Sequence, residues 1–347
     1  MGKLGYADKN NNESVNNKVT FVDLFSGIGG FHLGICQASE KLNIGSECLL
    51  SVDINKKAQL TYSRNFVGTQ QKDDVCDDDV KKTIFDGKKV DIVCGGFPCQ
   101  PFSLAGKKKG IKDDRGMLFK HIVEILETKK PKVVFLENVR NLMNIKNDDG
   151  GKTIDVIKLA MEEAGYPVQI RNYKATDFGL PTYRSRIYLV GFKNASHRKK
   201  FKWPEPTHDK DITLKEYFST LEKKWYAVNP DIEIKGWPDR IGNTLRVGGC
   251  DSGFRTTDGK RWRSIKDGDA RRDKRNWDSY MFFDGDKSKM VEHRLTVNEA
   301  KAIMGFPHDY IFPEVLSKRD AMKQLGNSVA VPVIEAIAKN IIDAIYD

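Results

Sequence analysis

Short apolar runs alternate with amphipathic stretches through the first half of the chain. A helical pattern at Met117–Glu127 is followed by another at Thr153–Gly165, which ends on a glycine suited to a C-cap. Strands that alternate with helices predict an α/β fold, with a mostly parallel sheet covered on both faces. The apolar runs that we interpret as its strands are Val19–Phe25, Cys48–Ile54, Val90–Gly96, Lys132–Val139 and Arg186–Phe192.

The pattern changes after about Ala195, where Gly, Trp, Arg and Asp replace helical periodicity until about Met290. Regular patterns return in LTVNEAKAIMGF, and Pro332 suits the first turn of a final helix. We therefore predict a flexible polar tail at residues 1–18, a main domain formed by residues 19–195 and 322–347, and a small irregular domain with a hinge at residues 196–321. The core face of the final helix is predicted to hold Ile334, Ile337, Ile341 and Ile345.

Composition limits the class of protein. The 347 residues are 39% hydrophobic and 31% charged, enough apolar material for a substantial core. No membrane-length apolar run or secretion signal is evident, so we expect a cytoplasmic protein. The six cysteines form no CxxC pair, and no His/Cys cluster has zinc-ligand spacing. We predict no metal site and no disulfide framework.

Charge is concentrated in the irregular domain. The chain carries a net charge of +10, and Arg255–Arg275 contains nine basic and four acidic residues, with Trp262 and Trp277 in or beside it. A basic segment with aromatic residues favours a nucleic-acid partner, although charge alone does not identify one.

The stretch VTFVDLFSGIGGFHLG has the pattern of a strand, a tight glycine turn and a helix. Gly27, Gly29 and Gly30 would let a ligand approach the backbone at a helix N-terminus. A dinucleotide fingerprint needs a further glycine where His32 stands, which disfavours NAD. A cofactor with an adenosine and no phosphates fits better, and S-adenosylmethionine is the usual one. The alternative is a turn that uses glycine for geometry alone.

Two acids follow neighbouring strands. Asp53 ends the second strand, where a carboxylate can bind the hydroxyls of a ribose. Asp74, after the presumed third strand, could bind an adenine amino group or be a solvated loop acid. His32 is expected to pack or to meet solvent near the turn, and no histidine has ligand spacing.

A thiol stands on a constrained turn in DIVCGGFPCQPFSLAG, where Cys99 lies between Pro98 and Pro101 directly after a strand. The next strand ends with Glu137 and Asn138, and neighbouring strand ends would bring Cys99 and Glu137 to one crevice. Arg184 and Arg186 begin another strand and, two residues apart, would share a face.

A thiol, a carboxylic acid, paired arginines and a methyl donor suggest methylation of cytosine at C5. A thiolate that adds at C6, with an acid at N3, makes C5 nucleophilic, which is covalent catalysis. The alternative for Cys99 alone is a buried structural cysteine.

The chain resembles bacterial DNA (cytosine-5) methyltransferases from about Val19 to the C-terminus. The matching motifs, in the order usual for that family, are DLFSGIGG, GGFPCQPFS, ENV, YRSR, RLTVNEAKAIMGFP and QLGNSVAVPV. The resemblance implies a Rossmann-like methyltransferase domain that uses S-adenosylmethionine, together with a small target-recognition domain. One departure is Thr182, where the family usually has glutamine, which puts that residue's contact in doubt.

The resemblance also implies roles for single residues. Cys99 would attack C6, Glu137 would hold and protonate N3, Arg186 would bind the cytosine O2, and Arg184 would support the thiolate or a nearby phosphate. The cofactor pocket would be lined by Phe25, Ser26, Gly27, Ile28, Gly29, Gly30, Asp53, Ile54, Asp74, Val75, Pro98, Asn327, Ser328 and Val329. Candidate DNA contacts are Ser103, Lys107 and Arg115 on a closing loop, and Thr244, Leu245, Arg246, Arg263 and Arg272 in the recognition domain.

The target cytosine must leave the duplex stack to reach a thiol in a crevice, at a cost of about a few kcal/mol. The loop Ala105–Arg115 could close on the DNA backbone, or it could be a solvated charged loop. The arginines of the recognition segment could read guanine edges or only follow phosphates.

We therefore predict a monomeric DNA (cytosine-5)-methyltransferase, either paired with a restriction endonuclease to protect host DNA or acting as an orphan. The alternatives are a tRNA cytosine-5 methyltransferase, a DNA-binding protein without activity, and an NAD-dependent oxidoreductase. The long, basic recognition segment favours duplex DNA.

Overall fold

The computed structural model describes residues 17–85, 87–98, 117–147, 150–214, 216–217, 279–283, 290–294 and 296–346. The chain divides into two compact units. Unit 1 is Met1–Tyr173, Ser185–Pro204 and Ile334–Asp347, and unit 2 is Lys174–Arg184 and Glu205–Val333. The predicted domain boundaries stay a prediction, because much of the irregular segment lies outside the described residues.

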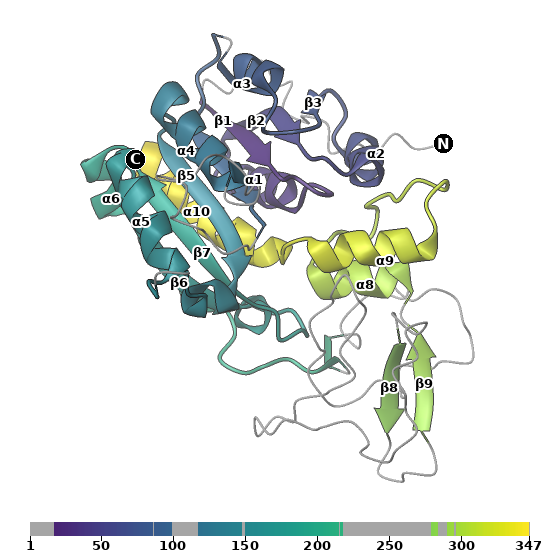
Figure 1. Ribbon diagram of the computed structural model, residues 1–347. Helices are drawn as coiled ribbons and strands as arrows, with labels where there is room; N and C mark the ends of the chain where they lie inside the picture. The colour runs from purple at the N-terminus through teal and green to yellow at the C-terminus, as the bar shows by residue number, and fades with distance from the viewer. Residues whose placement is uncertain are drawn as a thin grey trace. The chain divides into compact units, whose positions relative to one another are not determined.

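Unit 1 is built on a seven-stranded sheet with the order β3-β2-β1-β4-β5-β7-β6 (Figure 1). β1 pairs in parallel with β2 and β4, β2 with β3, and β4 with β5, whereas β7 is antiparallel to β5. The predicted mostly parallel sheet is thus confirmed. The strands are β1 Lys18–Leu24, β2 Gly45–Val52, β3 Gln71–Lys72, β4 Ile92–Gly96, β5 Val133–Val139, β6 Val168–Lys174 and β7 Ser185–Phe192.

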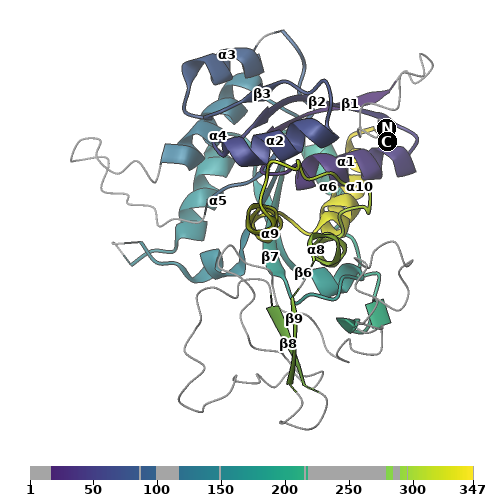
Figure 2. The same ribbon diagram turned by 90° about the vertical axis from the view of Figure 1, so that its right-hand side faces the viewer.

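Helices cover both faces of this sheet. Figure 2 shows α4 and α5 on one side of the strands and α1 and α10 on the other. Gly165 follows α5 with φ 86°, so the predicted glycine stop lies where the chain must turn left-handed. The helices of the described residues in this unit are α1 Gly30–Lys41, α2 Lys56–Asn65, α3 Asp78–Phe85, α4 Met117–Lys129, α5 Thr153–Glu163, α6 Ala195–Lys200 and most of α10 Val331–Tyr346, with the 3₁₀ turn η2 Arg140–Asn144 after β5. The 3₁₀ turn η3 Ala175–Phe178, which follows β6, belongs to unit 2.

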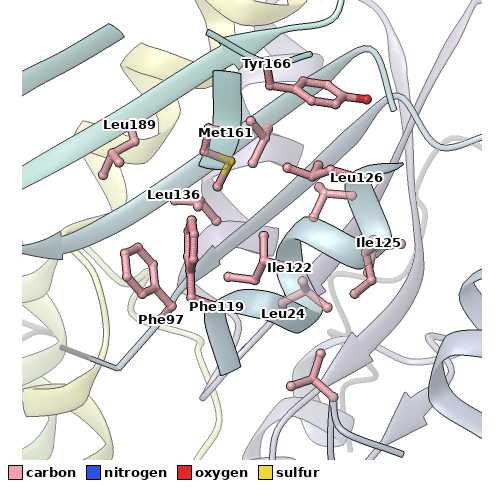
Figure 3. Packing of buried hydrophobic residues seen from close by; sticks show 14 of the residues in the cluster. Leu24, Phe97, Phe119, Ile122, Ile125, Leu126, Leu136, Met161, Tyr166 and Leu189 are labelled. Carbon is pink, nitrogen blue, oxygen red and sulfur yellow. The ribbon is translucent and has the colours of Figure 1, made fainter. Parts of the chain in front are cut away.

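The core on the α4 and α5 side combines strand residues with one stripe from each helix (Figure 3). Leu24 and Leu136 come from the sheet, while Ile122 and Met161 come from α4 and α5, and all four are fully buried. Phe97, directly after β4, packs against Phe119 with ring centroids 5.8 Å apart. The chain that leaves β4 toward Cys99 is therefore held in the core by its first residue.

The C-terminal helix closes the opposite face, as its isoleucine spacing predicts. Ile334, Ile337 and Ile341 are fully buried and Ile345 nearly so. A Cβ on Gly34 of α1 would lie 2.7 Å from Cγ2 of Ile334, so α1 and α10 approach more closely than a larger residue would permit. A segment from the end of the chain thereby completes the core begun by β1.

The order of strands reverses between β1 and β4, which places a topological switch point at their carboxyl ends. β1 ends at Leu24, before the glycine turn, and Leu24 pairs with Gly95 near the end of β4. Open α/β sheets bind ligands at such a point, because connections leave the two strands in opposite directions. The glycine turn after β1 and the turn that leads to Cys99 after β4 therefore both begin at this switch point.

Unit 2 contains α8 Val297–Met304 and α9 Lys318–Asn327, together with the antiparallel pair β8 Ser279–Phe283 and β9 Met290–Arg294. α8 begins with a capping box, in which Thr296 Oγ1 accepts from the Glu299 amide and the Glu299 carboxylate accepts from the Thr296 amide. α8 confirms that regular structure resumes in LTVNEAKAIMGF. Among the described residues, every helix is too short or too polar to cross a lipid bilayer.

A buried carboxylate ties the amino edge of the sheet to the C-terminal helix. Asp91 accepts from the Thr20 amide at 3.0 Å and from the Tyr346 hydroxyl at 3.1 Å, and it pairs with Lys132 at 3.0 Å. Replacing Asp91 with alanine should lower the free energy of unfolding by about 2–4 kcal/mol, because buried donors and a cation lose their partner. Urea denaturation measures this change.

The matched control is Asp343→Ala. Asp343 pairs with Lys339 one turn away at 2.9 Å on the same helix that carries Tyr346. An exposed pair of this spacing contributes about 0.3–0.5 kcal/mol. Equal effects of the two substitutions would contradict the assignment of Asp91 as the junction.

Candidate active site

The glycine turn after β1 has the backbone that its sequence predicts. Gly27 and Gly29 have φ values of 55° and 80°, and Gly29 is the N-cap of α1. Phe25 also has a positive φ of 55°, which is uncommon for an aromatic residue and marks a constrained turn. The Ser26 amide donates to the Val52 carbonyl at 2.9 Å, which fastens the turn to the end of β2.

Asp53, directly after β2, faces this turn. Its Oδ2 accepts from the Gly27 amide at 2.7 Å, and its Oδ1 accepts from the Asn55 amide at 2.7 Å. Burial raises the pKa of Asp53, and the two backbone donors act in the opposite direction by favouring the charged form. The Gly27 amide, which a pyrophosphate would need, already has a carboxylate partner. The arrangement therefore disfavours a dinucleotide.

The other residues predicted to bind a cofactor differ in exposure. Ile54 is 74% exposed beside Asp53, and Pro98 is exposed after β4, whereas the side chains of Ile28 and Val75 are buried. Asp74 follows β3, and its Oδ1 accepts from the Cys76 amide at 2.9 Å. Ile28 and Val75 can therefore offer a ligand only their backbone, while Ile54 and Pro98 can offer side chains.

Two contacts fix the strand end that leads to Cys99. Gly95 has φ 155°, and a Cβ there would lie 2.0 Å from the Leu24 carbonyl oxygen, so only glycine permits β4 to run this close to β1. After the strand, Asn138 Nδ2 donates to the Phe97 carbonyl at 3.0 Å. The ENV segment of β5 thus holds the GGFP turn from the neighbouring strand.

Glu137 lies on the other side of the same turn. Gly96 is its partner in the β4–β5 ladder, and a Cβ on Gly96 would lie 3.3 Å from Oε2 of Glu137. Arg186 Nε is 2.8 Å from Oε1 of Glu137, and both side chains are mostly buried. β7 is antiparallel to β5, so its first residues lie at the edge where β5 ends. The structure brings Glu137 and Arg186 together, as their motifs predict.

Arg184 has different partners. β7 begins at Ser185, so Arg184 directly precedes the strand, and its position on the same face as Arg186 stays a prediction. Within unit 2, Arg184 is buried and donates to the carbonyls of Gly326 and Ser328. It fixes the segment at the end of α9 that contains Asn327, which is exposed, between buried Gly326 and Ser328. Its predicted support of a thiolate or phosphate stays a prediction.

Several predicted residues lie outside the described residues, and their roles stay predictions. They are Cys99, Ser103, Lys107, Arg115, Thr244, Leu245, Arg246, Arg263 and Arg272. Val329 is buried in unit 2, next to Ser328, and Thr182 is fully buried in the same unit. Within the described ranges, no three His, Cys, Asp or Glu side chains gather as metal ligands.

His32 packs near the glycine turn, one of the two outcomes expected for it, whereas the burial of Asp23 was not predicted. His32 is 4% exposed, and its Nδ1 lies 2.6 Å from the Tyr62 hydroxyl oxygen. Burial lowers the pKa of His32 to about 3, so the ring is neutral. Asp23, at the end of β1, is fully buried, and burial raises its pKa well above the usual range. The signal in the sequence was Asp23, a charged residue inside the predicted strand Val19–Phe25.

Fold and site together define a doubly wound α/β protein with an acid, an arginine and a glycine turn at the carboxyl edge of its sheet. Residues 19–343 match the model of the C-5 cytosine-specific DNA methylase family. The chain therefore belongs to the C-5 cytosine-specific DNA methylases.

Curated relatives match over most of their length. Type II methyltransferase M.HpaII of Haemophilus parainfluenzae is 34% identical over 96% of this chain and 91% of its own. Type II methyltransferase M.HhaI of Haemophilus parahaemolyticus is 35% identical over 92% of this chain and 93% of its own. The chain is thus similar to type II restriction-modification methyltransferases.

Solved structures share the fold at lower identity. The methyltransferase EhMeth of Entamoeba histolytica has a TM-score of 0.64 and 20% identity over 95% of this chain and 100% of its own. A Spodoptera frugiperda DNMT2 variant has a TM-score of 0.61 and 21% identity over 93% of this chain and 99% of its own. These likenesses support the methyltransferase fold.

Proposed function

We propose that this chain transfers a methyl group from S-adenosylmethionine to C5 of a cytosine in a specific duplex DNA sequence. The observation that carries the proposal is the arrangement at the end of β4 and β5. The carboxylate of Glu137 lies against Gly96 and pairs with Arg186, whose Nε is 2.8 Å from Oε1. Gly96 is three residues before Cys99 in the chain. An acid and a cation at this strand end, with a thiol three residues after Gly96 in the sequence, fit covalent activation of a cytosine.

The chain's own residues would activate the base. The Cys99 thiolate adds to C6, and the displaced C5=C6 π electrons shift toward C4 and N3. Glu137 holds and protonates N3, which leaves an enamine with a nucleophilic C5. Arg186 binds the cytosine O2 and keeps the Glu137 carboxyl in place. When bound, S-adenosylmethionine supplies an electrophilic methyl group to C5. Removal of the C5 proton expels the Cys99 thiolate from C6, and the N3 proton returns to Glu137, which restores the aromatic ring and the starting state of both side chains.

The glycine turn and its neighbours fit this cofactor. No atom would lie within 4 Å of a Cβ on Gly27, so space is open beside the turn. Asp53 offers carboxylate oxygens for ribose hydroxyls, and exposed Ile54 offers an apolar surface for adenine. The charge of Asp53 at the Gly27 amide opposes phosphates but suits a cationic sulfonium. Phe25, Asp74 and Pro98 would complete the part of the pocket that unit 1 supplies. The predicted cofactor contacts of Asn327, Ser328 and Val329 stay predictions.

The target base must be flipped out of the duplex, since its C6 edge lies within the stack. We assign loop closure to the segment with Ser103, Lys107 and Arg115, and sequence recognition to the segment with Arg246, Arg263 and Arg272. The kinship with type II methyltransferases favours a role in protecting host DNA beside a cognate endonuclease. Nothing in the proposed chemistry requires more than a monomer.

Methyl transfer from labelled S-adenosylmethionine to mixed-sequence duplex DNA and, in parallel, to tRNA tests the proposal. Mass analysis of the digested product identifies the modified nucleoside. We expect 5-methyldeoxycytidine from the duplex only. Label found only in tRNA would show that the substrate is tRNA and not duplex DNA. No label in either nucleic acid would overturn the assigned activity.

A further inference from the structure

The glycine turn rests on an aromatic ring. A Cβ on Gly29 would lie 2.2 Å from Cε2 of Phe66, so the turn's backbone packs directly against the ring of that side chain. Phe66 follows α2 and is buried. The position of the turn at Gly29 is therefore limited by Phe66, a residue outside the glycine motif.

His32 stacks on the same Phe66 ring. Its imidazole stacks on Phe66 with centroids 3.9 Å apart and planes within 17°, and its ring also meets Phe21 of β1 edge-on at 5.1 Å. The backbone of His32 also acts on the buried carboxyl of Asp23, near the end of β1, where it opposes the rise in the pKa of Asp23 that burial causes. One residue in the first turn of α1 thus contacts both the strand before the glycine turn and the ring beneath it.

A hydrogen bond fixes the plane of the His32 ring. Nδ1 of His32 and the Tyr62 hydroxyl oxygen are 2.6 Å apart, and both side chains are buried. The Tyr62 hydroxyl is also 3.5 Å from the Cys48 Sγ of β2. A ring held only by stacking can rotate in its plane, whereas a short hydrogen bond between buried groups selects one orientation.

We propose that His32 and Tyr62 are positioning residues for the methyl-donor site, acting through Phe66 on the glycine turn without touching the donor. The hydrogen bond orients His32, His32 orients Phe66, and Phe66 sets the position of Gly29 and of the Gly27 amide that binds Asp53. The binding residues on this turn are thereby held in place before the donor arrives, which lowers the ordering cost of binding. This inference rests on the proposed function.

Tyr62→Phe tests it, because the ring remains and only the hydroxyl is lost. Isothermal titration with S-adenosylhomocysteine should show affinity weakened about three- to tenfold, the range expected when one orienting hydrogen bond is removed. The KM for the methyl donor should rise by a similar factor, while kcat changes less than about twofold. Amide hydrogen exchange at Gly27 and Gly29 should become faster in the free variant.

The matched control is Tyr166→Phe. Tyr166 is equally buried, and its hydroxyl donates to the Pro131 carbonyl at 2.7 Å, near the amino end of β5 and away from the turn. Both variants lose one buried hydroxyl bond in the same unit, so both should lower the unfolding temperature. Only Tyr62→Phe should weaken S-adenosylhomocysteine binding. Unchanged binding in Tyr62→Phe, or equal weakening in both variants, would overturn the proposal.

His32→Phe supplies the second arm, since it keeps a stacking ring but removes Nδ1. The double variant with Tyr62→Phe should bind no more weakly than the weaker single variant, because both remove the same interaction. If the losses of affinity in the two single variants simply add in the double variant, His32 and Tyr62 act independently, and the proposal that Tyr62 acts through His32 is refuted. Failure of the wild-type protein to bind S-adenosylhomocysteine would instead contradict the proposed function itself.

Discussion

Cys99→Ser should reduce methyl transfer at least about a thousandfold, because a serine hydroxyl at neutral pH is a far weaker nucleophile than a thiolate. The Cys99 side chain faces C6 in the proposed reaction, whereas the donor contacts are assigned to the glycine turn, Asp53 and Ile54. Affinity for S-adenosylhomocysteine should therefore stay within about twofold of the wild-type value. Labelled methyl transfer and calorimetric titration measure the two quantities on one preparation.

Cys36→Ser is the matched control. Cys36 lies in α1, half-buried, where its Sγ accepts from Ser46 Oγ at 3.4 Å. It has no assigned role, so its variant should methylate duplex DNA at the wild-type rate. Persisting activity in Cys99→Ser would sink the covalent mechanism even if the family assignment stands.

The adduct itself can be trapped. A duplex with 5-fluorocytosine at the target position lets C6 addition and methylation proceed but blocks loss of the C5 substituent, because fluorine does not leave as a cation. The protein should then remain covalently attached to DNA through Cys99 under denaturing conditions. A noncovalent complex on this substrate would contradict a Cys99–C6 bond.

The sheet was predictable where strands are buried on both faces. β1, β4 and β5 are continuous apolar runs because helices cover both sides, and each was predicted to within two residues at either end. β6 was not predicted: VQIRNYK has a single fully buried position, Tyr173, and forms the last strand in the sheet order. α9 was not predicted either, since KRDAMKQLGN is mostly polar and is defined by its Ser317 capping box and tertiary contacts.

The candidate site was predictable where it follows strand ends. Asp53 and Glu137 could be placed because parallel strands end at one edge, and the start of antiparallel β7 brings Arg186 to that edge. Arg184 could not be placed, since its direction depends on carbonyls at Gly326 and Ser328, far away in the sequence. The role of His32 depends on Phe66 and Tyr62, whose contacts a linear pattern does not contain.

Glu137→Gln should lower kcat about 10²- to 10⁴-fold, the usual contribution of a positioned general acid. The amide has almost the volume of the carboxyl and keeps an oxygen beside Arg186, whose Nε now lies 2.8 Å from Oε1. It cannot deliver a proton to N3, so negative charge builds on the ring when the thiolate adds. Single-turnover methylation of a duplex at saturating donor isolates this step.

The contribution of the Glu137–Arg186 pair to stability must be separated from its contribution to catalysis. Both side chains are mostly buried, so loss of one charge should also lower the free energy of unfolding, by about 1–3 kcal/mol. Arg186→Gln breaks the same pair from the other side and leaves the acid present. If the ion pair served stability alone, both variants would lose stability and keep similar kcat values.

The proposed chemistry predicts a different outcome for the two variants. Glu137→Gln should remove N3 protonation and stop the reaction before the C6 adduct forms, whereas Arg186→Gln should mainly weaken binding of the flipped base. Adduct yield on the 5-fluorocytosine duplex distinguishes them: near zero for Glu137→Gln and recoverable at high DNA concentration for Arg186→Gln. Glu163→Gln, an exposed acid at the end of α5, should match the wild type. Full adduct formation by Glu137→Gln would show that N3 gains its proton from another group, and Glu137 would then be a structural partner of Arg186.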